Sequence, residues 1–277
     1  MTALVRTSLS RIAHLDRFEV EPLSREYWAD GDYVIGAVTG LPGPGVGIEL
    51  TDGRMMQVDI GDRLLGAFGV RFATLEATGT WEAIGPDGRM AAMTAAGLFG
   101  KLTSKSPLIP TLTELRYRGH VLAAGRKAVM RDFALPDTGR TFTIPVLLII
   151  GSSMSAGKTR SAQIIIRRLR ALGLRVLAAK LTGAGRYRDL LAMRDAGADP
   201  IFDFVDAGLP STVCPAADYR QAASALLSHM AAVAADVAVI EAGASPLEPY
   251  NGDVAVELLE PCVRLTVLCT ADPYAVV

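Results

Sequence analysis

The stretch that decides the fold reads Val146-Leu147-Leu148-Ile149-Ile150-Gly151-Ser152-Ser153-Met154-Ser155-Ala156-Gly157-Lys158-Thr159. Its first five residues are all apolar, which predicts a buried strand of a parallel sheet. A loop of small residues follows, and the spacing of Ile165, Leu169 and Leu172 predicts an amphipathic helix over residues 159–172. A strand, a small-residue loop and a helix that begins at Gly-Lys-Thr form the arrangement that wraps backbone N–H groups around a polyphosphate.

The loop residues have expected roles in binding such a ligand. Gly157 lets the backbone approach the phosphates, Lys158 contacts the β and γ oxygens, and the Thr159 hydroxyl ligates Mg²⁺. The usual pattern, G-x-x-x-x-G-K-[ST], has its first glycine at the position of Ser152, whereas here the glycine comes one residue earlier. The alternative is a chance Gly-Lys-Thr at a helix start. The candidate cofactor-binding residues are Gly151, Ser152, Ser153, Met154, Ser155, Ala156, Gly157, Lys158 and Thr159, with Thr182 further along the chain.

The remainder of the C-terminal half continues the same alternation of apolar strands and helices. Strands are expected at 174–179, 201–205, 237–240 and 265–269, and helices at 187–196 and 216–234. This order predicts an α/β domain with a parallel sheet that is covered on both faces. The pattern changes near residue 138, so we expect a nucleotide-binding domain at 139–277 after an N-terminal domain at 1–138.

Charged residues stand at the ends of three of these strands, where ligands of parallel sheets bind. Lys180 is a candidate catalytic residue, with a solvent-exposed lysine as the alternative. Glu241 ends the strand at 237–240, and because an ionised carboxylate there is costly unless it is paired or metal-bound, we expect it to face Mg²⁺. Asp203 and Asp206 could ligate the metal or simply cap a loop before Gly208. The predicted catalytic residues are thus Lys158, Lys180 and Glu241, and the predicted metal ligands are Thr159, Glu241, Asp203 and Asp206.

The N-terminal half is expected to be β-rich, as a small barrel or a sandwich. Short apolar runs over 34–38, 45–50, 55–58, 64–68 and 72–78 alternate with turn residues, and Asp52-Gly53 predicts a hairpin with a tight turn. A helix is expected at 90–98 and a further strand at 115–124. Gly97-Leu98-Phe99-Gly100-Lys101 could border a ligand cleft or a subunit contact, but no chemistry comparable to the phosphate loop is found here.

Composition excludes several classes of protein. Of the 277 residues, 50% are hydrophobic and 21% charged, which excludes a disordered chain. The formal net charge of −1 gives no basic field for nucleic acid, and no apolar run approaches the ~20 residues of a membrane span. Cys214, Cys262 and Cys269 form no pairing pattern. We therefore expect a cytoplasmic protein with free thiols.

The motifs together resemble the dethiobiotin synthetase-like group of P-loop NTPases. The resemblance rests on Gly151–Thr159, on Lys180-Leu181-Thr182-Gly183 and on Ile240-Glu241-Ala242-Gly243, and covers roughly residues 142–277. A closer resemblance is to a family that includes a D-glutamate N-acetyltransferase, through Asp203–Gly208 and the segment from Ile240 to Gly252. Ser153 stands where both groups usually have Asp, and Ala242 and Ala244 stand where they have Gly.

The resemblance implies an ATP- and Mg²⁺-binding enzyme that acts on a small-molecule carboxylate or amine, with a homodimer as a possible assembly. Lys180 would then hold the acceptor or the transferred phosphoryl group. An acyltransferase that grips the phosphates of acetyl-CoA is the alternative, and a non-enzymatic, nucleotide-gated module is a third. Folds of this kind continue beyond the strand at 265–269, so a truncated or unusually short P-loop domain is expected, with the adenine pocket unassigned.

Overall fold

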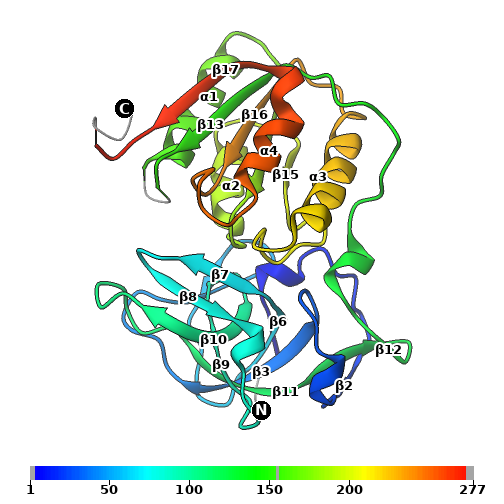
Figure 1. The fold of residues 1–277 in the computed structure, drawn as a ribbon, viewed down its shortest axis with the longest axis vertical. Coiled ribbons are helices and arrows are strands. Elements are labelled where there is room, and N and C mark those ends of the chain that lie inside the picture. Colours follow the sequence, from blue (N-terminus) through cyan, green and yellow to red (C-terminus); the bar gives the residue numbers. More distant parts are fainter. Residues whose placement is uncertain (1–3, 154–155, 273–277) are drawn as a thin grey trace. The chain divides into compact units, whose positions relative to one another are not determined.

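The computed structural model describes residues 4–153 and 156–272, which divide into two compact units. Unit 1 comprises Met1–Ala134 with the short segments Ala184–Tyr187 and Gly208–Ser211, and unit 2 comprises Leu135–Gly183, Arg188–Ala207 and Thr212–Val277. Unit 1 is rich in strands, whereas unit 2 combines a sheet with helices (Figure 1). Over the described ranges, no helix has the length and apolar character needed to cross a membrane.

Unit 1 is built on a ten-stranded sheet whose pairings close into a ring. The main path runs β1-β6-β3-β11-β9-β10-β8-β7, β2 and β12 pair with β11, and β6 also pairs with β10. Because β6, β3, β11, β9 and β10 each pair with the next and β10 returns to β6, they have the topology of a small barrel. The strands are β1 (Leu4–Arg6), β2 (Glu19–Glu21), β3 (Tyr33–Gly40), β6 (Arg63–Phe68), β7 (Val70–Ala73), β8 (Ala77–Thr80), β9 (Arg89–Ala92), β10 (Leu98–Lys105), β11 (Glu114–Ala123) and β12 (Arg126–Lys127), with β4 (Ile48–Glu49) and β5 (Met55–Met56) in a separate pair.

The barrel closes around an apolar core. Val34, Leu64, Phe99 and Leu115 come from four different strands of the ring and are all buried in one cluster. Phe68 belongs to the same cluster, and its ring stacks on the partly buried Trp28 with 4.8 Å between ring centroids. Burial of large aliphatic and aromatic side chains is the main source of stability for such a unit.

Two predictions for unit 1 are wrong. Residues 90–98 are not a helix but the end of β9, a turn and the start of β10, because Phe99 pairs with Ala92 across an antiparallel ladder and Gly97, at φ +92°, reverses the chain. Local helix propensity of the alanines is overridden by strand pairing. Residues 72–78 are not one strand but belong to the hairpin of β7 and β8, in which Ala73 pairs with Ala77.

The hairpin predicted around Asp52-Gly53 is confirmed, with a different turn. β4 and β5 are antiparallel, with Ile48 opposite Met56. The Leu50 amide donates to the Arg54 carbonyl at 2.9 Å, so three residues form the turn, and only Gly53 has a positive φ, +85°. A three-residue loop that ends in a left-handed glycine replaces the two-residue primed turn.

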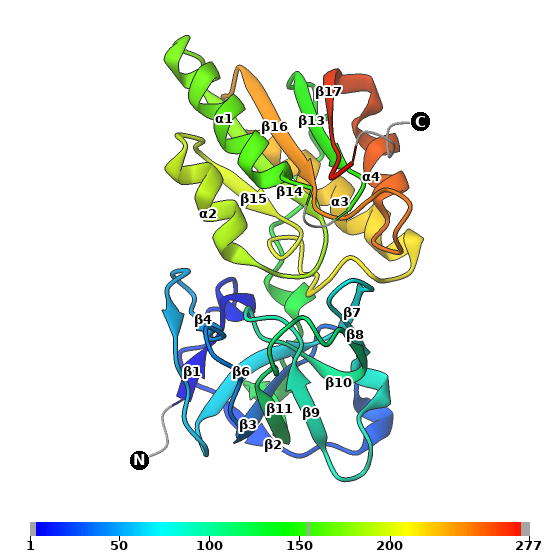
Figure 2. The same ribbon diagram turned by 90° about the vertical axis from the view of Figure 1, so that its left-hand side faces the viewer.

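Unit 2 has the predicted α/β architecture, a five-stranded parallel sheet with helices on both faces. The order is β15-β14-β16-β13-β17, and all pairs are parallel. Helices α1 and α2 cover one face and α3 and α4 the other (Figure 2). The strands are β13 (Val146–Gly151), β14 (Val176–Thr182), β15 (Ile201–Asp203), β16 (Val237–Ala242) and β17 (Val263–Cys269), and the helices are α1 (Lys158–Ala171), α2 (Tyr187–Asp195), α3 (Ala216–Met230) and α4 (Gly252–Leu259).

Two features of unit 2, the end of β14 and the start of helix α4, differ from the sequence prediction. β14 runs to Thr182, three residues beyond its expected end, so that Lys180 and Thr182 are strand residues. Helix α4 was not predicted from the sequence. It follows Asn251, a non-glycine residue with φ +57°, whose side chain donates to the carbonyls of Thr212 and Cys214. These bonds hold the left-handed turn at which the helix begins.

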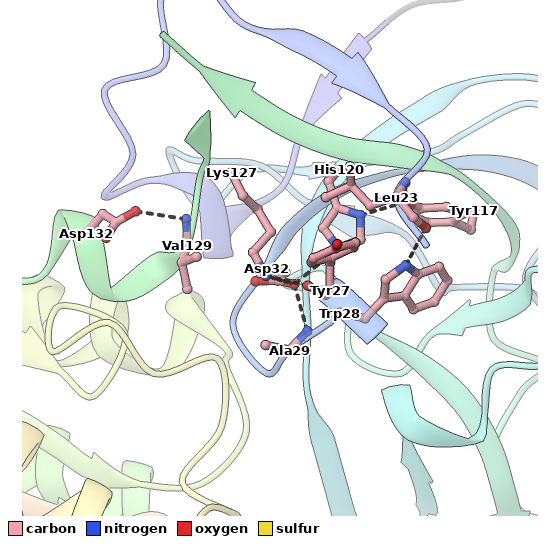
Figure 3. Close-up of polar contacts among 10 residues, drawn as sticks. All are labelled: Leu23, Tyr27, Trp28, Ala29, Asp32, Tyr117, His120, Lys127, Val129 and Asp132. Atoms are coloured by element: carbon pink, nitrogen blue, oxygen red, sulfur yellow. Dashed lines mark hydrogen bonds and ion pairs between the residues drawn. The ribbon is translucent and has the colours of Figure 1, made fainter. Parts of the chain in front are cut away.

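Unit 1 also contains a buried polar network (Figure 3). Asp32 is fully buried, and its Oδ2 accepts hydrogen bonds from the Ala29 amide at 2.7 Å, from Lys127 Nζ at 2.8 Å and from His120 Nε2 at 3.1 Å. The other ring nitrogen of His120 lies 2.6 Å from the Tyr117 hydroxyl. Burial raises the pKa of Tyr117, and the Asp32 charge raises it further. This chain of contacts places an ion pair inside the barrel unit.

Candidate functional site

The sheet of unit 2 has a topological switch point at the carboxyl ends of β13 and β16. These strands are neighbours, and the helices that follow them, α1 and α4, lie on opposite faces of the sheet. Parallel sheets bind ligands at such a point, because the two outgoing loops diverge and leave room between them. The predicted phosphate loop follows β13, so the sequence motif and the topological switch point coincide.

The predicted phosphate loop lies between β13 and α1. Gly151 ends the strand, and Gly157, with φ +89° and ψ +12°, is the left-handed residue before α1 begins at Lys158. The Ser152 amide donates to the Cys269 carbonyl of β17 at 3.0 Å. Of the other predicted contacts, Met154 and Ser155 lie outside the described residues.

The early position of the first glycine has a steric reason. A Cβ placed on Gly151 would lie 3.0 Å from the Cys269 carbonyl oxygen and 3.0 Å from Cγ and Cδ of Lys158. Glycine at this position therefore lets the aliphatic part of Lys158 pass close to the strand end. A side chain on residue 151 would displace the lysine or separate β13 from β17.

Lys158 is buried and folds back on its own loop. Its side chain is 2% exposed, and Nζ donates to the Ser153 carbonyl at 2.6 Å. Burial lowers the pKa of the ammonium group, and the charge of Lys180 lowers it further, while Glu241 and Glu248 act in the opposite direction. A bound anion would stabilise the charged form of Lys158, because it offsets the free-energy cost of burying that charge.

Thr159 and Glu241 form a side-chain contact between the first turn of α1 and β16. The Thr159 hydroxyl donates to Glu241 Oε2 at 3.0 Å, and Glu241 is 2% exposed. Glu241 pairs in register with Ile149 of β13, and its side chain reaches the first turn of α1. A hydroxyl and a carboxylate are both hard oxygen ligands, so this pair fits the donors that Mg²⁺ prefers.

Lys180 is not a solvent-exposed lysine, because it is 7% exposed and pairs with Asp189 of α2 at 2.7 Å. It stands in register with Glu241 on the neighbouring strand. Two residues later, Thr182 is fully buried, and its hydroxyl has no hydrogen-bond partner among the residues that the structure describes. Buried hydroxyls are normally bonded, so Thr182 is a polar group available at the ends of these strands.

The predicted metal set is not brought together as a whole. Asp203 Oδ1 accepts from the Val205 amide, and Asp206 Oδ2 accepts from the Asp203 amide, both at 2.8 Å, so each supports the turn after β15. The part of the chain that the structure describes contains no group of three or more His, Cys, Asp or Glu side chains that could hold a metal. Asp203 and Asp206 therefore do not join Glu241 in such a group, and the loop-supporting alternative describes their geometry.

Gly243, which follows β16, allows the chain there to approach the end of β14 closely. A Cβ on Gly243 would lie 2.2 Å from the Thr182 carbonyl oxygen and 2.5 Å from Lys180 Cε. The Gly243 amide donates to that same carbonyl at 3.1 Å. Ala242 and Ala244 are nearly fully buried and are accommodated. Among these three residues, the close approach is made at Gly243.

Three further residues were missed from the sequence. Asp189 is the partner of Lys180, and an acid in the first turn of the helix after that strand was the available signal. Glu248 accepts a hydrogen bond from the Ser245 amide at 2.8 Å, and its negative charge acts to raise the pKa of Lys158. The Thr212 hydroxyl donates to the Tyr250 carbonyl at 2.7 Å and accepts from the Gly183 amide at 3.0 Å. No local pattern indicates that Thr212 joins the loops after β14 and β16.

Comparison with known proteins adds no assignment. No protein-family model matches the chain, and no curated protein matches it. The chemistry of the site therefore has to be argued from its own geometry: a buried lysine, a hydroxyl paired with a carboxylate, and a second buried lysine in register with that carboxylate.

Proposed function

We propose that unit 2 binds a nucleoside triphosphate with Mg²⁺ at residues 151–159 and acts as an ATP-dependent enzyme on a small-molecule carboxylate or amine. The observation that carries the proposal is the 3.0 Å hydrogen bond between Thr159 and Glu241, beside the buried Lys158. The order of the three motifs along the chain, which resembles that of dethiobiotin synthetase-like P-loop proteins, agrees with it.

The Glu241 carboxylate favours a metal-bound nucleotide over acetyl-CoA. A phosphate bound without metal at this loop would face a carboxylate that lies within hydrogen-bond distance of Thr159. Like charges this close repel strongly in a buried site. Mg²⁺ held by Thr159 and Glu241 would neutralise phosphate charge and so remove the repulsion. In an acyltransferase that used the loop without metal, this repulsion would weaken the binding of the CoA phosphates.

The chain's own residues supply positioning and charge. Lys158 exchanges the Ser153 carbonyl for the β and γ oxygens, and the amides of the loop and of the first turn of α1 bind the same phosphates. Lys180 holds the acceptor carboxylate or the transferred phosphoryl group. A carboxylate oxygen attacks the γ-phosphorus, the bond from that phosphorus to its bridging oxygen breaks, and ADP leaves with the electron pair. An amine then attacks the activated carboxyl carbon and phosphate leaves.

Titration calorimetry tests the proposal. The full-length protein is titrated with ATP, ADP and acetyl-CoA, each with and without Mg²⁺. We expect Mg²⁺-dependent binding of ATP, its loss in Lys158→Ala, and its retention in Arg160→Ala, an exposed α1 residue that bonds only Gln163 among the described residues. Unchanged ATP binding in Lys158→Ala would refute the assignment of the loop. Binding of acetyl-CoA without metal would instead support the acyltransferase, and nucleotide binding without turnover of any acceptor offered would support a nucleotide-gated module.

A further inference from the structure

Unit 1 contains a cleft of about 480 Å³ at the point where β10 leaves β9. The ladder between these strands ends at the pair of Ala91 and Gly100, and from Lys101 onward β10 pairs with β8 instead. The cleft lies beside the diverging strands and is lined by Arg89, Lys101, Leu102, Glu114, Leu115 and Arg116, among others. Its volume is in the range of sites that bind small organic molecules.

Two of the cations in this cleft stand close enough to repel each other. Arg89 of β9 and Arg116 of β11 are directly opposite each other in the antiparallel register. Directly opposed residues have their Cβ atoms about 4.5–5.5 Å apart, and like charges in that position destabilise the sheet. Lys101 adds a third positive charge to the same cleft. All three side chains are exposed, so each can move to meet a ligand.

The carboxylates nearby leave these cations incompletely neutralised. Asp87 lies 3.5 Å from Arg89, and both side chains are exposed. The Glu114 side chain lies against Gly40 of β3, where a Cβ would come within 2.7 Å of Oε2. Neither Lys101 nor Arg116 forms an ion pair with any residue between 4 and 272 that the structure describes. Three cations and one carboxylate line the cleft, and with Asp87 beside Arg89 one positive charge remains without a neighbouring carboxylate.

Part of the cleft lining is apolar. Met90 and Leu115 are buried in the barrel core and contribute atoms to the lining, and Leu102 is half-buried beside them. A second cleft of about 680 Å³ shares Thr39 with the first, and its lining includes the apolar Val20 and Ile60 as well as Arg63 and Arg118. A ligand with a charged head at the arginines can therefore place an apolar body on the protein.

We infer that this cleft binds a small organic dianion, of the chemical type of a phosphate monoester with an apolar body. Two guanidinium groups side by side match the oxygens of a phosphate, because each can donate two parallel hydrogen bonds. Lys101 supplies a third donor, and Leu102 and the core residues of the lining contact the hydrocarbon part of the ligand. The inference concerns unit 1 alone and stands independently of the nucleotide site.

Phenyl phosphate serves as the probe, with inorganic phosphate and benzyl alcohol as its two halves. Its dissociation constant is measured by saturation-transfer NMR on the full-length protein and on Arg116→Gln, Lys158→Ala and Arg54→Gln. Arg54 is the matched control, an exposed arginine of unit 1 that lies 4.0 Å from Asp52. Because Arg116 is exposed, we expect Arg116→Gln to fold as the wild type does, which its melting temperature checks.

We expect phenyl phosphate to bind more tightly than either half, and roughly tenfold more weakly to Arg116→Gln. Lys158→Ala and Arg54→Gln should bind it as the wild type does. Loss of binding in Lys158→Ala with no change in Arg116→Gln would place the probe at the phosphate loop and overturn the inference. Equal binding of inorganic phosphate and phenyl phosphate would overturn the apolar part, and no binding at millimolar concentration would overturn the whole.

Discussion

Lys180 of β14 and Glu241 of β16 stand opposite each other in the parallel register, so that a buried cation and a buried carboxylate occupy one row of the sheet. The row continues through Ile149 of β13, two residues before the phosphate loop. Glu241 reaches Thr159 of α1 and Lys180 reaches Asp189 of α2, and both helices lie on the same face. Strand register, more than loop conformation, brings these charges to the end of β13.

The Glu241 carboxylate is expected to determine how strongly ATP binding depends on Mg²⁺. In Glu241→Gln the side chain keeps its size and can still accept from Thr159, but it loses the charge that attracts the metal. Removing one charged ligand should lower the affinity for MgATP about tenfold or more and leave the weak, metal-free binding unchanged or improved. Titration calorimetry across a range of Mg²⁺ concentrations measures this.

Glu257→Gln is the control for that experiment, because Glu257 lies on α4 and pairs with Arg220 at the surface. Its MgATP affinity should match the wild type. Equal metal dependence in Glu241→Gln and the wild type would remove Glu241 from the metal site.

Replacing Lys158 with methionine should separate stability from ligand binding. The variant removes a buried charge whose pKa is lowered by burial, and it also removes the hydrogen bond to Ser153. Since the two effects oppose each other, we expect the ligand-free protein to be as stable as the wild type or up to about 1 kcal/mol more stable. Saturating MgATP, at 100 times its Kd, should stabilise the wild type by about 2.7 kcal/mol and the variant not at all. Urea unfolding with and without ligand measures both. A destabilised variant that still responds to MgATP would show that Lys158 is structural.

The predictability of unit 2 from sequence follows from the local nature of its signals. The apolar run Val146–Ile150, the loop glycine and the stripe of α1 are each readable over a few residues, and the structure confirms the strand and the helix there. The contact of Thr159 with Glu241 joins residues 82 positions apart. It depends on β16 lying next to β13, which no local pattern specifies.

Unit 1 was harder to predict because its strands depend on distant partners. Ala91 and Ala92 are acceptable helix residues, and only pairing with β11 and β10 makes them a strand. Arg89 and Arg116 are likewise brought opposite each other only by the register of β9 and β11. They lie 27 positions apart in the sequence, and neither belongs to a motif. Like-charge pairs of this kind become visible only once the ladder is known.

The pair of Asp236 and Arg175 should make the sheet sensitive to acid in a narrow range of pH. Hydrogen bonds from the Arg175 side chain and backbone amide lower the pKa of Asp236 from its ordinary 3.8 to about 2. A carboxyl with a lowered folded-state pKa stabilises the protein above its ordinary pKa, and this stabilisation is lost as the pH falls toward the folded-state value. The difference in free energy of unfolding between the wild type and Asp236→Asn should therefore be constant from pH 7 to about 4 and disappear by about 2.

Urea unfolding at several pH values between 7 and 2 checks this expectation. Arg175→Gln removes the larger cause of the lowered pKa, the side-chain hydrogen bonds, and keeps the one from the backbone amide, so its difference from the wild type should fall over the same range of pH with a smaller amplitude. A difference that persists unchanged at pH 2 would mean that Asp236 stabilises the strand starts by packing and not by its charge.

In unit 1, the partly exposed Lys127 should be worth more to stability than its exposure suggests. Its ammonium lies 2.8 Å from Asp32, a fully buried carboxylate. The other oxygen of Asp32, Oδ1, has no hydrogen-bond partner within the described ranges 4–153 and 156–272. In Lys127→Met that buried charge loses its counter-ion and keeps only the bonds from Ala29 and His120. Removing one partner of a buried pair costs about 3–5 kcal/mol, and the lower end applies here because Lys127 is 26% exposed at its side chain.

The double variant Asp32→Asn with Lys127→Met discriminates charge from packing. It removes both charges at once, so the destabilisation should be smaller than the sum of the two single variants, by roughly 1 kcal/mol or more. Lys105→Met is the matched control, since Lys105 is an exposed lysine of the same unit that bonds two carbonyls. Its stability should stay within about 0.5 kcal/mol of the wild type. Additive losses in the double variant would show that Asp32 and Lys127 do not interact, and that His120 and the Ala29 amide hold Asp32 in place.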